Sequence, residues 1–158
     1  MLITRDDFRI DARNFDLTDG HNVLRIICGL FMFPHIAGKF VAGAVNPGTV
    51  AFFAKAGFAP PESWVLLAAC AEGATGIALV LGLCTRWSAL GAAGVMAFAV
   101  YALQVVKGFG WTWNTGGYEY PVFWGIAAVA VALTEFKRMA ATSENRRPAA
   151  SLNGLRHA

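Results

Sequence analysis

The sequence predicts an all-α membrane protein, a transmembrane four-helix bundle in antiparallel up-down order with both termini in the cytoplasm. The first observation is composition, because 56% of the 158 residues are hydrophobic and only 15% are charged, against about 25% charged in ordinary soluble domains. The second is the presence of four apolar runs long enough to cross a bilayer. The third is the uneven distribution of lysine and arginine between the segments that connect these runs.

The first apolar run, over residues 24–45, carries most of the functional argument. It has the roughly 20 residues that a helix needs to cross a bilayer core of about 30 Å. It also contains Pro34, His35 and Lys39 well inside its length. A lysine at the centre of such a helix costs about 3 kcal/mol on insertion scales, so we expect a nearby anion that offsets its charge.

Three further spans are expected, separated by turn signals. Asn46-Pro47-Gly48 ends the first span, Thr85-Arg86 forms a short polar break, and Lys107-Gly108 opens a connection rich in glycine and aromatic residues. The predicted spans cover residues 24–45, 63–84, 87–106 and 120–136. The predicted organisation is a polar cytoplasmic lead over 1–22, a membrane domain over 23–137, and a basic, flexible cytoplasmic tail over 138–158.

The basic residues indicate which side of the membrane faces the cytoplasm. Only Lys55 and Lys107 fall on the side away from the termini, so the termini are expected to be cytoplasmic. Arg25 and Arg86 are expected to act as anchors whose long side chains reach the cytoplasmic surface. The basic residues on the side of the termini are Arg5, Arg9, Arg13, Arg25, Arg86, Lys137, Arg138, Arg146, Arg147 and Arg156.

An ion pair between Lys39 and Glu72 follows from the depths of the two residues. At 1.5 Å per residue, Lys39 lies about 22 Å from the start of the first span, and therefore about 8 Å from the outer surface. Glu72 lies about 12 Å below that surface on the next, antiparallel span. We expect the two side chains to meet, since each charge then lowers the cost of burying the other.

The residues around this pair predict a polar pocket in the outer half of the bundle. One stripe at helical spacing, Arg25, Cys28, Met32, His35 and Lys39, is expected to face the interior. Later spans and the aromatic loop between them supply the remaining members. The predicted ligand-binding residues are His35, Lys39, Glu72, Gln104, Trp111, Trp113 and Glu119.

Simpler interpretations of the same residues remain open. The Lys39–Glu72 pair can be a structural staple, and Trp111 and Trp113 can belong to an interfacial aromatic belt. For His35, an internal hydrogen bond is favoured over metal ligation, because no second ligand stands at zinc or haem spacing. No metal site and no nucleic-acid motif are predicted, and the three cysteines are expected to be packing residues.

A combination of spaced motifs runs through residues 24–136. It consists of Arg25-x3-Gly29, His35-x2-Gly38-Lys39, Phe53-x3-Gly57-x2-Pro60, Glu72-x3-Gly76-x2-Leu79-x2-Gly82-x2-Thr85-Arg86 and Gly116-Gly117-x-Glu119. In this combination the chain resembles the DoxX family of small four-span bacterial membrane proteins. It departs from the usual family pattern in its long lead and in the closing sequence TEFKRMA, which could form a specialised partner surface.

The resemblance implies a location in the bacterial cytoplasmic membrane and an association with membrane oxidoreductase systems, including quinone-linked thiosulfate oxidation. We therefore expect a subunit that binds a quinone or a lipid-like molecule and carries no covalent cofactor. His35 or Lys39 would hydrogen-bond the ligand carbonyl, Glu72 would hold the cation, and Glu119 would relay protons. The alternatives are a non-catalytic accessory subunit of a larger membrane complex and a small transporter. The expected partners are the lipid bilayer and other membrane subunits.

Overall fold

The computed structural model describes residues 3–145, which are mostly helical, as the composition predicts. The expected tail residues 146–158 lie outside this described part. Short 3-10 turns occur at Arg5–Phe8, Ala12–Phe15 and Trp113–Thr115. The α-helices are α1 (Gly20–Leu30), α2 (Met32–Ala37), α3 (Pro47–Lys55), α4 (Pro61–Leu81), α5 (Thr85–Lys107) and α6 (Glu119–Asn145), and a small hairpin pairs β1 (Phe40–Val41) with β2 (Ala44–Val45).

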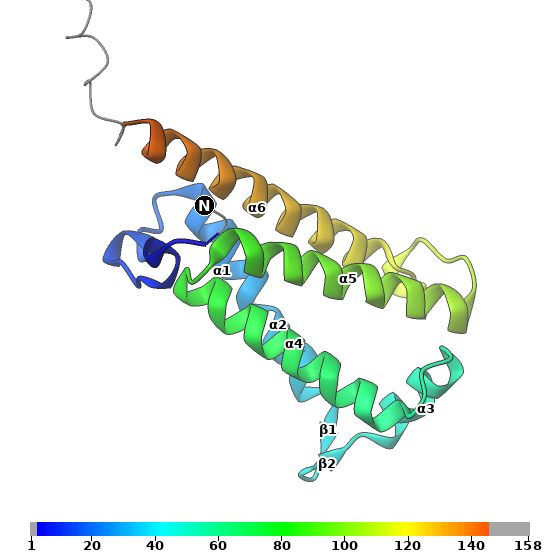
Figure 1. Cartoon of the computed structure of the whole chain (residues 1–158). Coiled ribbons are helices and arrows are strands. Elements are labelled where there is room, and N and C mark those ends of the chain that lie inside the picture. The colour runs from blue at the N-terminus through cyan, green and yellow to red at the C-terminus, as the bar shows by residue number, and fades with distance from the viewer. Residues whose placement is uncertain (1–2, 146–158) are drawn as a thin grey trace, which may run out of the picture.

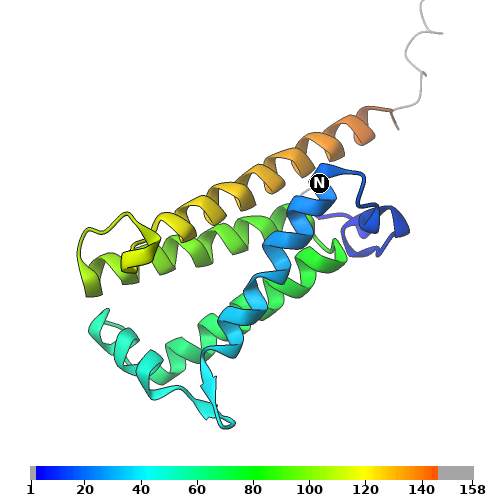
Figure 2. The ribbon, with the colours of Figure 1, turned by 180° about the vertical axis from the view of Figure 1, so that it is seen from behind.

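Three of these helices, α4, α5 and α6, are long and apolar enough to cross a membrane. Helices α5 and α6 run antiparallel and side by side along their length, whereas α4 diverges from α5 with distance from the turn that joins them (Figure 1 and Figure 2). That turn is tight because Gly82 (φ +75°) and Cys84 (φ +44°) adopt left-handed backbone conformations. The bounds of the predicted second and third spans, 63–84 and 87–106, agree with those of α4 and α5 to within a few residues.

The first predicted span is longer than the helix in the structure. The helix ends at Ala37, whereas the prediction continued it to residue 45. The helix is also interrupted at Phe31, between α1 and α2. Pro34 explains the interruption, since it cannot donate a hydrogen bond to the carbonyl of Leu30 and its ring crowds that turn. After Gly38 the chain forms the β1–β2 hairpin, whose two-residue turn has positive φ at Ala42 and Gly43, the geometry that suits a tight hairpin.

The described parts of the polar lead and of the predicted tail contain more regular structure than the sequence indicates. The predicted fourth span ends at residue 136, but α6 continues to Asn145. This extension contains strong helix formers and neither glycine nor proline, so no local signal stops the helix. The polar lead forms two 3-10 turns, and these pack at the end of the molecule where the α4–α5 turn and the end of α6 also lie (Figure 1).

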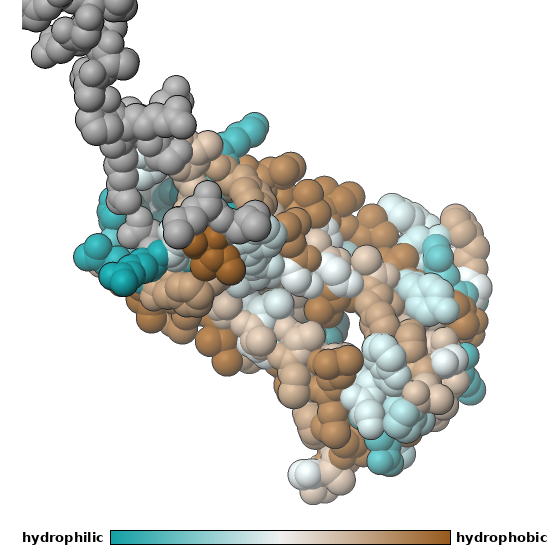
Figure 3. All heavy atoms as spheres, viewed as in Figure 1, coloured by the Kyte–Doolittle hydropathy of each residue, from teal (hydrophilic) through white to brown (hydrophobic). Residues whose placement is uncertain are grey.

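The helices meet most closely where α1 crosses α4. A Cβ atom on Gly29 would stand 2.7 Å from the carbonyl oxygen of Gly76, so only glycine permits this approach. The main core beside this crossing includes Met32, Leu79, Met96 and Trp124. On the surface, apolar residues cover the middle of the molecule and hydrophilic residues gather toward its two ends (Figure 3).

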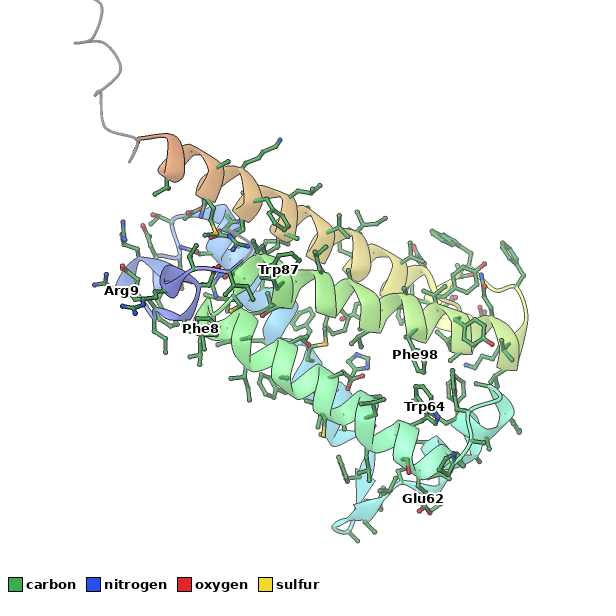
Figure 4. The ribbon with its side chains drawn as sticks, in the orientation of Figure 1. Phe8, Arg9, Glu62, Trp64, Trp87 and Phe98 are labelled. Carbon is green, nitrogen blue, oxygen red and sulfur yellow. The ribbon has the colours of Figure 1, made fainter. Side chains whose placement is uncertain are left out.

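An aromatic cluster bridges α4 and α5 at a distance from the turn that joins them, where the two helices have separated. Trp64 of α4 and Phe98 of α5 face each other across this space (Figure 4), with ring centroids 5.9 Å apart. Phe58, from the loop after α3, stacks on Phe98 at 4.6 Å. The rings connect the two separated helices, and the space-filling surface is hollowed between α4 and α5 on the side of the cluster nearer to their turn (Figure 3).

Candidate functional site

The structure brings Lys39 and Glu72 together in the apolar part of the molecule. Lys39 lies just beyond the end of α2, and its Nζ is 2.7 Å from both carboxylate oxygens of Glu72 on α4. The two side chains are 11% and 8% exposed. The ammonium also donates to the carbonyl oxygen of His35 at 3.2 Å, where a cation complements the C-terminal end of α2.

This geometry uses the full donor capacity of Lys39. An ammonium group has three N–H donors, and three protein acceptors surround it: two carboxylate oxygens and one carbonyl. A ligand could hydrogen-bond Lys39 only by displacing one of these acceptors. The contacts therefore favour a structural role for the ammonium.

His35 lies on α2 with its ring directed toward α6. The imidazole stacks on Tyr120 with centroids 6.3 Å apart, and it lies 5.4 Å from the ring of Trp124. Trp124 is held in place because its Nε1 donates a buried hydrogen bond of 3.2 Å to the carbonyl oxygen of Cys28 on α1. His35 itself is exposed. It therefore offers an accessible surface beside the rings of Tyr120 and Trp124.

The aromatic loop forms a separate groove at the start of α6. This groove has a volume of about 630 Å³, and its lining includes Trp111, Trp113, Glu119 and Tyr120. Gln104 is exposed on α5 and is not among the lining residues. The structure thus divides the predicted pocket into two neighbourhoods, one around His35, Lys39 and Glu72 and one at the loop. Tyr120 connects them, because it stacks on His35 and also lines the groove.

Arg25 and Arg86 are buried, which corrects the expectation that they extend to the membrane surface. Arg25 is 2% exposed, and its guanidinium donates to the carbonyl oxygens of Leu79, Val80 and Asn14. It therefore satisfies carbonyls at the C-terminal end of α4, which have no partner within that helix. The sequence did contain a signal of this burial, because Arg25 belongs to the stripe of the first span that was expected to face the interior.

Asp7, which lies beside the α4–α5 turn, is a residue whose role the sequence analysis missed. Its carboxylate accepts a hydrogen bond of 2.9 Å from Arg86, and the two side chains are 3% and 5% exposed. The Asp7 carbonyl oxygen also accepts from the backbone N–H of Cys84 at 2.6 Å. A single aspartate in a polar lead gives no sequence signal for such a contact, because its partner is 79 residues away.

Polar side chains from the lead, α1 and α6 surround a cavity of about 740 Å³ at this end. Asp19 caps α1 and accepts a hydrogen bond of 2.8 Å from Arg138 of α6. That hydrogen bond, followed by one from the backbone N–H of His21, lowers the pKa of Asp19. Nε2 of His21 lies 3.4 Å from a carboxylate oxygen of Glu135. These contacts fasten the start of α1 to the C-terminal part of α6.

Comparison with known proteins identifies the family. The DoxX family model matches residues 20–105, which is more than half of the chain. The matched stretch contains His35, Lys39, Glu72 and the buried arginines, whereas the aromatic loop and α6 lie outside it. No match was found among curated proteins or among solved structures. The chain is a membrane protein with several apolar helices, and it belongs to the DoxX family.

Proposed function

We propose that the protein crosses the bacterial cytoplasmic membrane four times, with α1 and α2 together as the first crossing. From Gly20 to Ala37 a helix rises about 27 Å, close to the thickness of a bilayer core. The beginning of the described chain and the end of α6 lie at the same end of the molecule (Figure 2), as an even number of crossings requires. The excess of arginine and lysine at that end supports a cytoplasmic orientation.

We further propose that the protein is a subunit of a membrane oxidoreductase assembly and holds a quinone or a similar ring-bearing amphipathic molecule against His35. The observation that carries this proposal is the exposed imidazole placed against the rings of Tyr120 and Trp124. Aromatic rings offer a stacking surface to a flat ligand. The N–H of the imidazole can donate a hydrogen bond to a carbonyl oxygen of the ligand.

Because Lys39 already uses its three donors, its contacts support His35 as the residue that makes the polar contact with the ligand. In this arrangement Lys39 and Glu72 fix the end of α2, and His35 one turn earlier meets the ligand. Glu119 lies at the neighbouring groove and would exchange protons only through intervening groups. The proposal therefore makes His35 the residue to test first.

The test is quinone binding by the full-length protein in lipid nanodiscs, measured from the quenching of tryptophan fluorescence by a short-chain quinone. His35→Leu removes the hydrogen-bonding ring, and we expect affinity to fall about tenfold, as for a lost hydrogen bond to a buried ligand. Phe33→Leu is the matched control, because Phe33 is an exposed ring on the same helix. Equal affinity in both variants and the unaltered protein would reject the site.

A non-catalytic accessory subunit is the second candidate, and the saturated Lys39–Glu72 pair favours it. In that case the pair holds the helices in place and no small ligand is needed. Native electrophoresis in mild detergent tests this candidate, and the quinone-binding assay separates it from the first one, which also expects a larger assembly. Migration in a larger complex that persists with His35→Leu supports the accessory role, whereas migration only as a free small protein rejects it.

A further inference from the structure

The groove at the start of α6 combines one carboxylate with several accessible aromatic rings. Trp111, Trp113 and Phe123 line it and are 50%, 70% and 71% exposed. A cation placed over such rings is attracted by their electron-rich faces, and tryptophan is the strongest of them in this respect. A carboxylate among exposed rings is therefore suited to an ammonium group.

Glu119 is the charged residue of this lining, and it is free to meet a cation. Its Oε2 accepts one long hydrogen bond of 3.4 Å from the backbone N–H of Trp113. None of the ion pairs formed within residues 3–145 involves Glu119. It stands at the first residue of α6, where the helix dipole favours the ionised carboxylate.

A second, apolar groove continues from this site along the spanning helices. It has a volume of about 430 Å³ and shares Val122 and Ile126 with the aromatic groove. Small residues, including Ala97 of α5 and Gly125 of α6, form its floor. The two grooves therefore place a polar site at the start of α6 and an apolar groove toward the middle of α5 and α6.

We propose that the two grooves form one binding site for a bilayer phospholipid with an ammonium headgroup. The ammonium lies against Glu119 and the tryptophan rings, and an acyl chain lies between α5 and α6. The negative charge of Glu119 discriminates against anionic headgroups, which an aromatic belt alone would not do. The site uses neither His35 nor Lys39, so it stands independently of the quinone proposal.

The test measures which lipids stay bound to the full-length protein when it is extracted from bilayers. The bilayers contain equal amounts of phosphatidylethanolamine and phosphatidylglycerol with identical acyl chains, and retained lipid is quantified by native mass spectrometry. We expect about tenfold enrichment of phosphatidylethanolamine, from one cation–π contact and one exposed ion pair. Glu119→Gln should lower the enrichment to the smaller part that the ring contact supplies.

Glu62→Gln is the matched control, because Glu62 is an exposed acid in the first turn of α4 at the same end of the molecule (Figure 4). It should leave the enrichment unchanged, whereas Trp113→Leu should reduce it. Ala97→Phe fills the apolar groove from an exposed position and should reduce retention of both lipids. Equal retention of the two lipids by the unaltered protein, or an enrichment that is unchanged in Glu119→Gln, overturns the headgroup site. Unchanged total retention in Ala97→Phe overturns the acyl-chain placement.

Discussion

Removing the charge of Lys39 should destabilise the protein strongly, because Glu72 would remain buried without a partner. Glu72 is 6% exposed, and both of its oxygens lie 2.7 Å from the Lys39 ammonium. Breaking a buried ion pair on one side costs about 3–5 kcal/mol. For a chain of this size that loss lowers the midpoint of thermal unfolding by about 10 °C. We therefore expect Lys39→Met to melt at a clearly lower temperature.

The double variant Lys39→Met with Glu72→Leu should recover most of this loss. Replacing both charges with apolar groups removes the cost of desolvating an unpaired ion, so its stability should lie within about 1 kcal/mol of the unaltered protein. The assay is the thermal midpoint of the purified protein in detergent, read from the fraction that stays monodisperse after heating. Lys55→Met is the control, because Lys55 is an exposed lysine.

Two outcomes would refute the reasoning. If Lys39→Met melts within about 1 °C of the unaltered protein, the pair contributes little. If the double variant loses the sum of the two single losses, the residues act independently and the contact between them carries no coupling energy. A restored double variant that also binds quinone normally would confine the pair to a structural role.

Three further predictions concern the helix crossing and the polar end. Gly29→Val should destabilise by about 3 kcal/mol through overpacking at the crossing, whereas Gly94→Ala, whose added Cβ would have no neighbour within 4 Å, should be neutral or slightly stabilising in the same thermal assay. Asp7→Asn should lower the thermal midpoint, because buried Arg86 loses its carboxylate partner. The pKa of Asp19 is lowered in the folded state, so its contribution is full above its ordinary pKa of about 3.9 and is lost as pH falls through the lower folded value. Thermal midpoints between pH 2 and 6 should therefore fall less steeply in Asp19→Asn than in the unaltered protein.

The sequence alone determined the membrane character, two of the long helices and the meeting of Lys39 with Glu72. These features depend on local quantities: the hydropathy of a run and the fixed rise of a helix per residue. The predicted pairing holds even though Lys39 stands beyond the helix end, because a shift of two residues moves it by only a few ångströms along the helix axis. The sequence analysis missed the hairpin after α2. The apolar run continues past the end of this helix, so hydropathy does not mark where the helix stops.

Only the tertiary structure decided which partners Arg25, Arg86 and Asp7 bind, and that the predicted pocket consists of two neighbourhoods joined at Tyr120. Arg25 reaches carbonyls more than fifty residues away, and Asp7 reaches Arg86 across 79 residues. Whether an arginine meets lipid headgroups or buried carbonyls depends on which chain segments pack beside it, and hydropathy does not contain that information. The ring of Tyr120 connects the two neighbourhoods for the same reason, because its position follows from the packing of α6 against α1 and α5.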